Sequence, residues 1–305
     1  MDRLDSMRAF EAVAREGSFT GAARRLGWST RLVSKYVAAL EARLGVQLFH
    51  RTTRSVALTD AGRAYVERCR SLLDQVEELE AAVQDHHAAL SGSIRMTAPT
   101  GFGSTRLPDA LADFMATHER VEIDLRLTDR QVSLVEEGFD LAIRISQLQD
   151  SALMARKLAD MPLVVCAAPR YLEAKGRPDH PQDLAGHACL VDGNQQDGGA
   201  LWSFWPRQEG KASATNRPEQ AETVRVAGRF RANAPAAVVR MAMAGRGITR
   251  SPFYAVQDAL EAGQLEALLP GYCSKVLGVY AIYPPDRHLS ARIRALIDHL
   301  VGWYG

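Results

Sequence analysis

The segment between Phe19 and Leu58 carries seven basic residues and one acidic residue, although the chain of 305 residues has a formal net charge of only +1. A local positive excess on a nearly neutral chain indicates a surface for a polyanion. The same segment consists of short apolar patterns separated by single glycines, which favours short helices joined by tight turns. The basic residues are Arg24, Arg25, Arg31, Lys35, Arg43, Arg51 and Arg54, and the acidic residue is Glu41.

Apolar residues at helical spacing predict three helices: one through Phe10 and Val13, one over residues 19–26, and one over residues 30–44. Gly17 and Gly45 follow the first and third helices, where a residue with left-handed backbone conformation commonly ends a helix. Ser18 and Ser29 precede the second and third helices, where a serine hydroxyl caps the free N–H groups. The spacing therefore predicts a helix-turn-helix.

The third helix has two different faces. Its apolar face consists of Leu32, Val33, Tyr36, Val37, Leu40 and Leu44. On the other side Arg31, Ser34, Lys35 and Ala38 follow the spacing i, i+3, i+4 and i+7. A helix of this kind fits the major groove of DNA, where arginine and lysine donate to guanine. We predict that this helix contacts duplex DNA, through Ser29, Thr30, Arg31, Ser34 and Lys35. The alternative is a solvated basic face on an ordinary helical bundle.

Two short β-prone runs between Val46 and Leu58 flank a basic, polar turn, which predicts a wing. Arg51 and Arg54 are expected to contact phosphates or to enter the minor groove. Such contacts add affinity and salt dependence rather than base specificity. Residues 1–58 are therefore predicted to form an all-α winged helix-turn-helix domain.

A heptad pattern covers the next segment, 59–90, and ends before Ser91-Gly92-Ser93. This pattern predicts a long linker helix whose seam pairs with a second copy of the chain, as paired DNA half-sites require. The predicted dimerisation residues are Tyr65, Leu72, Val76, Leu79 and Val83, and the seam also includes Cys69, His86 and Leu90. The alternative is that this stripe is buried against its own domain.

Three runs carry a resemblance to a known family: AARRLGWSTRLVS at 22–34, LGVQLFHRT at 44–52 and LTDAG at 58–62. The chain resembles the LysR-type transcriptional regulators. The resemblance implies a winged helix-turn-helix, a dimerising linker helix and a C-terminal effector domain like a periplasmic binding protein, often in a tetramer. Many members have Gln-Pro or Ser-Ala where this chain has Thr30-Arg31, so Arg31 is expected to provide a base contact that many relatives lack.

Residues 91–305 alternate β-prone and helical patterns, which predicts an α/β domain with a mostly parallel sheet. A short helix is expected at Leu134-Val135. The resemblance, which continues through 97–158 and Gly245-Arg246-Gly247-Ile248, implies two subdomains with a ligand between them. Subdomain I would comprise about 91–161 and 267–305, and subdomain II about 162–266. The hinge segments would lie near 159–162 and 265–270.

Ligands of open α/β sheets bind outside the carboxyl ends of the strands, where helix N-termini offer N–H groups. The predicted effector-binding residues are Thr100, Gly101, Phe102, Gly103, Arg144, Asn233 and Arg250. The first four form a glycine-containing turn after a strand, and the two arginines would pair with a carboxylate. Either arginine could instead be structural. The cluster Trp202, Phe204 and Trp205 is expected to pack in a core, or else to form a pocket wall.

The remaining expectations concern partners and chemistry. The predicted partners are a double-stranded DNA operator, an unknown anionic or aromatic effector, a second copy in a homodimer or homotetramer, and RNA polymerase if the protein is an activator. No enzymatic motif and no metal-ligand spacing is evident, so no catalytic residue, metal or cofactor is expected. The scattered cysteines and the lack of a long apolar run predict a cytoplasmic protein without membrane contact. The main alternative is an architectural DNA-binding protein without an effector.

Overall fold

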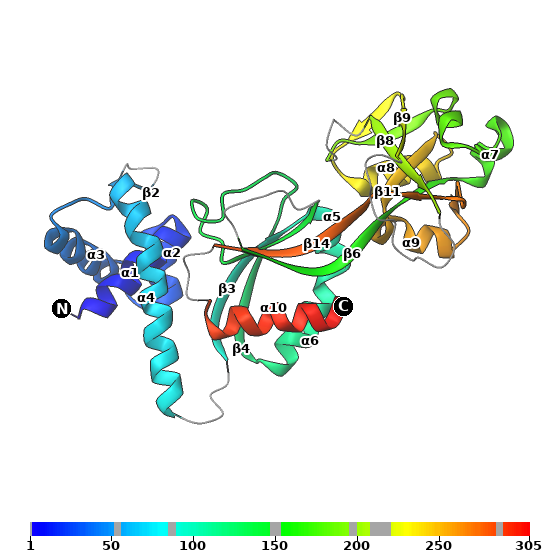
Figure 1. The fold of residues 1–305 in the computed structure, drawn as a ribbon. Helices are drawn as coiled ribbons and strands as arrows, with labels where there is room; N and C mark the ends of the chain where they lie inside the picture. The colour runs from blue at the N-terminus through cyan, green and yellow to red at the C-terminus, as the bar shows by residue number, and fades with distance from the viewer. Residues whose placement is uncertain are drawn as a thin grey trace.

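The computed structural model describes residues 2–51, 56–84, 90–146, 154–194, 200–207, 221–284 and 289–305. An N-terminal domain, a long helix and a two-lobed C-terminal domain follow one another along the molecule (Figure 1). The N-terminal domain contains α1 (Arg3–Glu16), α2 (Phe19–Leu26), α3 (Thr30–Leu44) and a hairpin of β1 (Phe49–Arg51) and β2 (Val56–Leu58). The long helix is α4 (Asp60–Gln84).

The predicted helix boundaries of the N-terminal domain are confirmed by their caps. The Ser18 hydroxyl accepts a hydrogen bond from the Gly21 N–H at 3.2 Å, and the Ser29 hydroxyl accepts one from the Leu32 N–H at 3.2 Å. Gly17 and Gly45 end α1 and α3 with φ angles of 60° and 70°. These are left-handed conformations that glycine adopts without strain.

The core of the N-terminal domain forms where α1 and α3 cross, around the buried Phe10, Val37 and Leu40. The apolar face predicted for α3 includes two residues that are exposed to solvent. Leu32 and Leu44, near the two ends of α3, are 36% and 38% exposed, whereas Val33, Val37 and Leu40 are buried.

The predicted seam of α4 is divided between two surroundings, which corrects the expectation of one continuous dimer stripe. The Tyr65 ring lies 5.5 Å from the Phe10 ring, and Cys69 is buried in the core of the N-terminal domain. Leu72 and Leu79 remain 43% and 69% exposed. The stripe of a 25-residue helix extends beyond the small domain on which its first turns pack. His86 and the side chain of Val83 lie outside the described residues, and Leu90 packs on the C-terminal domain.

The C-terminal domain contains a continuous sheet with strand order β10-β7-β11-β6-β14-β5-β3-β4. The strands of subdomain I are β3 (Ser91–Ala98), β4 (Arg120–Leu127) and β5 (Leu141–Ser146). Those of subdomain II are β7 (Cys189–Asp192), β10 (Phe230–Ala232), β11 (Ile248–Pro252) and β12 (Glu266–Ala267), with a separate small sheet of β8 (Leu201–Pro206), β9 (Glu222–Arg225) and β13 (Tyr272–Ser274). The two long strands β6 (Met154–Ala167) and β14 (Val276–Tyr283) join the subdomains.

Helices cover both subdomains (Figure 1). Subdomain I carries α5 (Thr100–Thr105), α6 (Leu107–Thr117) and the C-terminal α10 (Ala291–Tyr304). Subdomain II carries α7 (Pro169–Lys175), the 3₁₀ helix η1 (Pro181–Gly186), α8 (Pro235–Met243) and α9 (Phe253–Glu261). The predicted turn at residues 100–104 is therefore itself helical, and the helix expected at Leu134-Val135 is instead a series of hydrogen-bonded turns.

The sheet is mixed rather than mostly parallel, because β6 and β14 run antiparallel to each other and to their neighbours. The two chain crossings lie side by side where Pro162 pairs with Val276. The second crossing is therefore near 275–277 and not near 265–270 as predicted. Residues 267–274 belong with subdomain II, because Leu268 and Leu269 pack in its core and β13 pairs with β8.

The aromatic cluster of subdomain II is a core cluster. Trp202 and Phe204 are almost completely buried, and Trp205 is buried as well. This agrees with the core-packing interpretation of the sequence and leaves the alternative of a pocket wall without support. Within the described residues, no helix is long and apolar enough to cross a bilayer, and no group of three metal-ligating side chains occurs.

Candidate functional site

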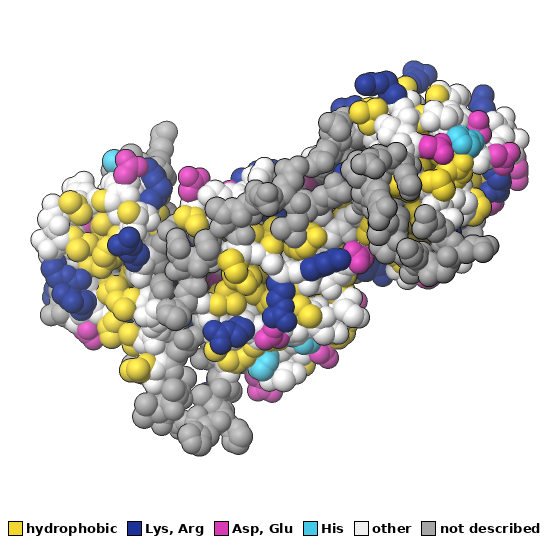
Figure 2. Space-filling model, viewed as in Figure 1, with side chains coloured by type: hydrophobic (Ala, Val, Ile, Leu, Met, Phe, Trp, Pro, Cys, Tyr) yellow, Lys and Arg dark blue, Asp and Glu magenta, His cyan; other side chains and the backbone are white. Residues whose placement is uncertain are grey.

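The exposed face of α3 is the first candidate site. Thr30, Arg31 and Lys35 are exposed, and Ser34 is half-buried on the same side. Neither Arg31 nor Lys35 forms an ion pair within the described part of the chain, so both charges are available to an external anion. Figure 2 shows Lys and Arg side chains gathered at the end of the molecule where α3 lies.

Ser29 has a structural role that the sequence also predicted, because its hydroxyl caps α3. The only acidic residue of the basic segment is used in the fold as well. The Glu41 carboxylate accepts hydrogen bonds from the Leu48 N–H at 2.9 Å and the Phe49 N–H at 3.3 Å. These bonds fix the start of the wing relative to α3.

The wing forms at the predicted place, since β1 and β2 pair antiparallel with Phe49 opposite Leu58. Arg51 is the last residue of β1, but its side chain and the whole of Arg54 lie outside the described residues. Their predicted phosphate contacts therefore remain predictions. Gly62 in α4 lies so close to the wing that a Cβ atom there would be 2.1 Å from the Leu48 carbonyl oxygen.

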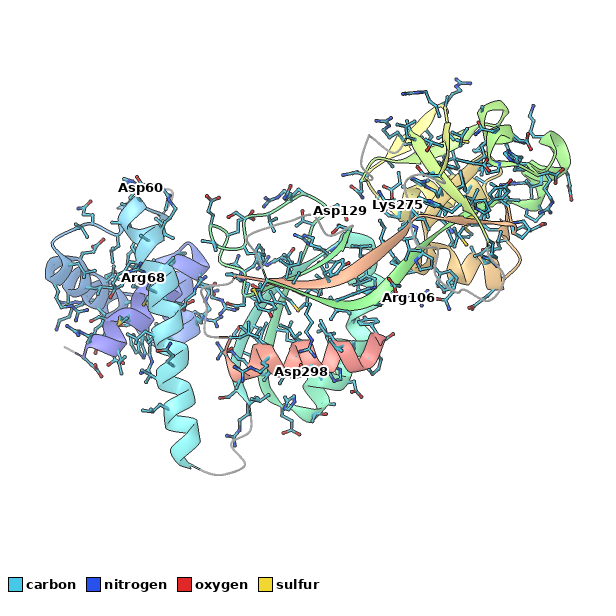
Figure 3. The ribbon with its side chains drawn as sticks, in the orientation of Figure 1. Asp60, Arg68, Arg106, Asp129, Lys275 and Asp298 are labelled. Carbon is cyan, nitrogen blue, oxygen red and sulfur yellow. The ribbon has the colours of Figure 1, made fainter. Side chains whose placement is uncertain are left out.

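The second candidate site is a cleft of about 190 Å³ between subdomains I and II. Its walls follow the carboxyl ends of the parallel strands, as expected for an open α/β sheet. Pro99, Asp129 and Ser146 follow or end β3, β4 and β5 on one side, while Asp192 and Pro252 end β7 and β11 on the other. Figure 3 shows Asp129 and Lys275 near the junction of the two subdomains.

Arg144 is the predicted effector residue that lines this cleft. Its Nη1 donates to the Ile143 carbonyl at 3.0 Å, while its buried Nη2 has no hydrogen-bond partner in the described residues. Burial lowers the pKa of Arg144, and the nearby Asp129 carboxylate opposes this shift. A buried guanidinium N–H without a partner is costly, so a ligand oxygen at this place would be bound favourably.

The predicted anion site at the start of α5 is already occupied by a side chain. The Thr100 N–H donates to the Asp129 carboxylate at 3.1 Å. A carboxylate on the helix N-terminus satisfies the group that we expected to bind the effector. Gly101 faces subdomain II, because a Cβ atom there would lie 2.7 Å from the Tyr254 hydroxyl.

Three other predicted effector residues are placed elsewhere. Phe102 is buried in the core of subdomain I, 5.5 Å from the Tyr254 ring, and Gly103 packs against Leu127 and Ala98. Both point inward because α5 is a helix and not an open turn. Arg250 is buried over the Trp202 ring at 5.2 Å, so it is a structural arginine of subdomain II.

Asn233 also does not line the cleft, although its neighbours Asn194 and Pro235 do. Its carbonyl oxygen accepts a hydrogen bond from the Asn194 side chain at 2.5 Å. Asn233 therefore supports the loop after β7. Asn194, and not Asn233, lines the cleft.

The sequence interpretation missed several lining residues, above all Asp129, Asp192, Tyr254 and Lys275. Asp129 and Asp192 come directly after or at the end of a strand, a signal that could have identified them. Tyr254 and Lys275 give no such signal, since one lies in a helix and the other at a strand crossing. Burial raises the pKa of Tyr254 far above its usual value, so its hydroxyl stays protonated and able to donate.

An ion pair links the two subdomains beside the cleft. The Arg106 guanidinium donates to the Asp258 carboxylate at 2.8 Å and to the Tyr254 carbonyl at 3.2 Å. Arg106 precedes α6 in subdomain I, whereas Tyr254 and Asp258 belong to α9. Figure 3 shows Arg106 at this junction. A change in the angle between the subdomains would alter the geometry of this ion pair, because its partners lie on different subdomains.

Two family models match the chain. The model of the bacterial regulatory helix-turn-helix protein of the lysR family matches residues 4–63, and that of the LysR substrate binding domain matches residues 87–304. The chain is 34% identical to the HTH-type transcriptional activator AaeR of Escherichia coli over 305 residues, which cover 100% of this chain and 94% of that protein.

A second relative and a solved structure extend the comparison. The chain is 34% identical over 298 residues to an HTH-type transcriptional repressor of Pseudomonas aeruginosa, covering 98% and 91% of the two chains. The structure of CrgA, a LysR-type transcriptional regulator from Neisseria meningitidis, matches with a TM-score of 0.60, 27% identity and full coverage of both chains.

Proposed function

The chain belongs to the LysR family of DNA-binding transcriptional regulators, and we propose which of its residues bind the operator and which bind the effector. The α3 face would enter the major groove, with Arg31 and Lys35 at base edges and Thr30 and Ser34 beside them. Arg51 and Arg54 in the wing would contact the phosphate backbone. The observation that carries this proposal is that Arg31 and Lys35, near the N-terminal end of α3, are exposed and have no ion-pair partner among the described residues.

A homodimer would present two such helices to two half-sites. The exposed Leu72 and Leu79, together with the half-buried Val76, lie on the α4 surface that its own domain leaves uncovered. Leucines exposed in this pattern favour pairing with the same helix of a second copy. Tyr65 is not part of this proposal, because its ring already packs on Phe10. A tetramer would need a further contact between C-terminal domains.

The effector would be a small molecule with a carboxylate or similar anionic group, bound between the subdomains. The buried Nη2 of Arg144, which has no hydrogen-bond partner among the described residues, supports this class, and Lys275 adds a second positive residue to the lining. The aspartates at 129 and 192 would accept hydrogen bonds from donor groups on the same molecule. The cleft is smaller than the roughly 300–1,000 Å³ of drug-sized pockets, which favours a small metabolite.

Control of DNA binding would follow from the angle between subdomains. A ligand shifts a conformational equilibrium only if it binds one arrangement better than the other. A molecule that contacts Arg144 on one side and Asp192 on the other would favour the closed arrangement. Relatives of equal identity include a named activator and a named repressor, so the likeness alone does not fix the sign of regulation, which would depend on operator position. The protein would act in the cytoplasm. If it is an activator, it would also contact RNA polymerase.

The decisive experiment is the selection of bound fragments from the source genome with the purified full-length protein at a fixed salt concentration. We expect a short inverted repeat, with affinity that falls steeply as salt rises. Addition of small carboxylates should then change the affinity for that repeat or raise the melting temperature of the protein. Salt-sensitive binding without sequence preference would contradict base reading by α3 and would favour the architectural alternative.

A further inference from the structure

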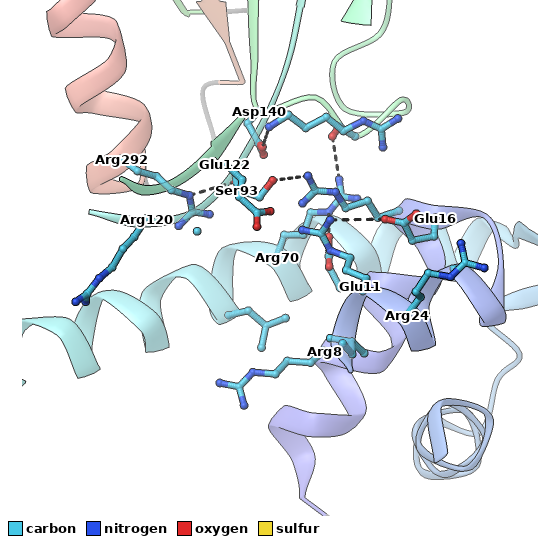
Figure 4. Close-up of a pocket in the computed structure, with 18 residues that line it drawn as sticks. Arg8, Glu11, Glu16, Arg24, Arg70, Ser93, Arg120, Glu122, Asp140 and Arg292 are labelled. Atoms are coloured by element: carbon cyan, nitrogen blue, oxygen red, sulfur yellow. Dashed lines mark hydrogen bonds and ion pairs between the residues drawn. The ribbon is translucent and has the colours of Figure 1, made fainter. Parts of the chain in front are cut away.

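A second, larger cleft separates the N-terminal domain from subdomain I. It has a volume of about 810 Å³ and is bordered by α1, α2 and α4 on one side and by β3, β4 and α10 on the other. It shares no lining residue with the cleft between the subdomains. Figure 4 shows its side chains projecting into the space from both domains.

Arginines dominate the lining of this interdomain cleft. Eight arginines and four carboxylates border it: Arg8, Arg15, Arg24, Arg25, Arg70, Arg95, Arg120 and Arg292, with Glu11, Glu16, Glu122 and Asp140. A concave site lined mainly by one sign of charge raises the local concentration of counter-ions. The polar lining makes an apolar ligand a poor fit for this cleft.

Most of the carboxylates are already engaged with the protein. Glu11 accepts from the Arg70 guanidinium at 3.0 Å, and Glu16 lies 3.6 Å from Arg25. One oxygen of Asp140 accepts from the Arg95 backbone N–H at 2.9 Å. The lining is still net positive, because its eight arginines outnumber its four carboxylates, although Arg8 and Arg95 also pair with Asp5 and Asp124 outside it.

Three of the arginines, Arg15, Arg24 and Arg120, form no ion pair in the described part of the chain. Arg15 crosses between the domains and donates to the Ser93 hydroxyl at 2.5 Å. Burial, and then the nearby Arg25, lower the pKa of Arg15. The carboxylates of Glu11 and Asp140 oppose this shift, so they offset part of the positive charge around Arg15. An anion in the cleft would be attracted by the guanidinium groups that have no carboxylate partner among the residues that the structure describes.

We propose that this cleft binds a small anion with two or more phosphate or carboxylate groups, which bridges the N-terminal domain and subdomain I. Arg15 and Arg24 would contact it from the N-terminal domain, and Arg120 from β4. Guanidinium groups bind phosphate and carboxylate in pairs of charge-assisted hydrogen bonds. Because both domains contribute, the anion binds only when they are in contact, and it stabilises this orientation of the N-terminal domain relative to subdomain I.

The test is calorimetric titration of the full-length protein with inorganic pyrophosphate, at an ionic strength kept constant with NaCl. We expect saturable binding that is weakened about fivefold or more by either Arg24→Gln or Arg120→Gln, one from each side of the cleft. Both residues are exposed, so neither substitution is expected to unfold the protein. The matched control is Arg225→Gln, an exposed arginine of β9 that should leave the affinity unchanged.

Two further variants separate this site from the other anion-binding surfaces. Arg144→Gln tests the cleft between the subdomains, and Arg31→Ala tests the α3 face; neither should change pyrophosphate affinity. The proposal is wrong if Arg24→Gln and Arg120→Gln bind pyrophosphate like the unmodified protein, if Arg144→Gln or Arg31→Ala alone removes binding, or if equimolar NaCl gives the same heat. Equal affinity for orthophosphate would also contradict a bridging, multivalent anion.

Discussion

The N-terminal domain and the cleft between the subdomains are built from the chain in opposite ways. The α3 face comes from one short segment, and its exposed residues lie a few positions apart in one helix. The cleft is assembled from residues between Pro99 and Leu277 that follow the ends of several strands. A local site can be inferred from spacing alone, whereas an assembled site depends on which strands become neighbours.

The two regions also differ in how far neighbours in the sequence share the same surroundings. In the N-terminal domain, residues next to the site are caps and turns whose chemistry is local. In subdomain I, Thr100, Gly101, Phe102 and Gly103 are consecutive but have four different surroundings. Adjacent positions in a short helix point in different directions, so a run of candidate residues cannot all face one ligand.

The largest expected effect tests the role of Phe102. Phe102→Ala should lower the free energy of unfolding by about 3–5 kcal/mol, because it removes a buried ring from a packed core. Urea unfolding of the full-length protein measures this loss. Phe253→Ala, at a partly exposed phenylalanine in α9, is the control and should cost much less. An unchanged stability with weaker ligand binding would restore Phe102 as an effector contact.

A backbone contact gives the next largest effect. Gly62→Ala should destabilise the N-terminal domain by about 1–3 kcal/mol, because its Cβ atom would meet the Leu48 carbonyl oxygen. Gly302→Ala in α10 is the matched control, since the added group would meet no described atom within 4 Å apart from its chain neighbours and the nearby backbone of its own helix. That control should be neutral or slightly stabilising. Thermal unfolding followed by circular dichroism compares the two, and equal melting temperatures would argue against the close approach.

Base reading by α3 is tested by Arg31→Ala. We expect the affinity for the selected operator to fall by about 1–3 kcal/mol at fixed salt, with a relaxed preference at one base pair. Fluorescence anisotropy with operator variants measures both quantities. Arg225→Ala, which removes an exposed arginine from β9, should leave them unchanged. A uniform loss on all sequences would mean that Arg31 contacts phosphate instead.

Removal of the ion pair between Arg106 and Asp258 should have a smaller effect. Arg106→Gln is expected to lower stability by no more than about 1 kcal/mol, because Asp258 is largely exposed to solvent. The same change should alter effector affinity by loosening the contact between α6 and α9. Arg156→Gln removes an exposed ion pair with Asp298, neither of which lines the cleft, and should not change that affinity. Identical affinities in both variants would exclude a role of Arg106 in closure.

The smallest expected effect is a difference in reactivity among the thiols of the N-terminal and C-terminal domains. Burial raises the pKa of Cys69, Cys166 and Cys189 to about 12, so these groups remain neutral at pH 8. Only the thiolate reacts with iodoacetamide, so we expect the half-buried Cys273 to be modified first in the native protein. Mass spectrometry of peptides gives the order, and labelling in denaturant provides the control. Rapid native labelling of Cys69 would show that α4 separates from its domain.

The sequence predicted the helices and wing of the N-terminal domain closely, because serine and glycine caps act on their own neighbours in the chain. It also predicted two lobes in the C-terminal domain. It predicted a mostly parallel sheet and a second crossing near 265–270, and both were wrong. Residues 267–274 carry no local pattern that assigns them to one lobe, and only their partners show to which lobe they belong.

The sequence by itself determined the basic helix, its caps, the long α4 and the general α/β character, because these depend on periodicity and on interactions over a few residues. The tertiary structure decided that Tyr65 packs inward, that Asp129 caps α5, and that Arg144 rather than Arg250 faces the ligand cleft. It also brought together the arginines of the interdomain cleft. These outcomes depend on contacts between residues far apart in the chain, and the spacing of one sequence does not specify such contacts.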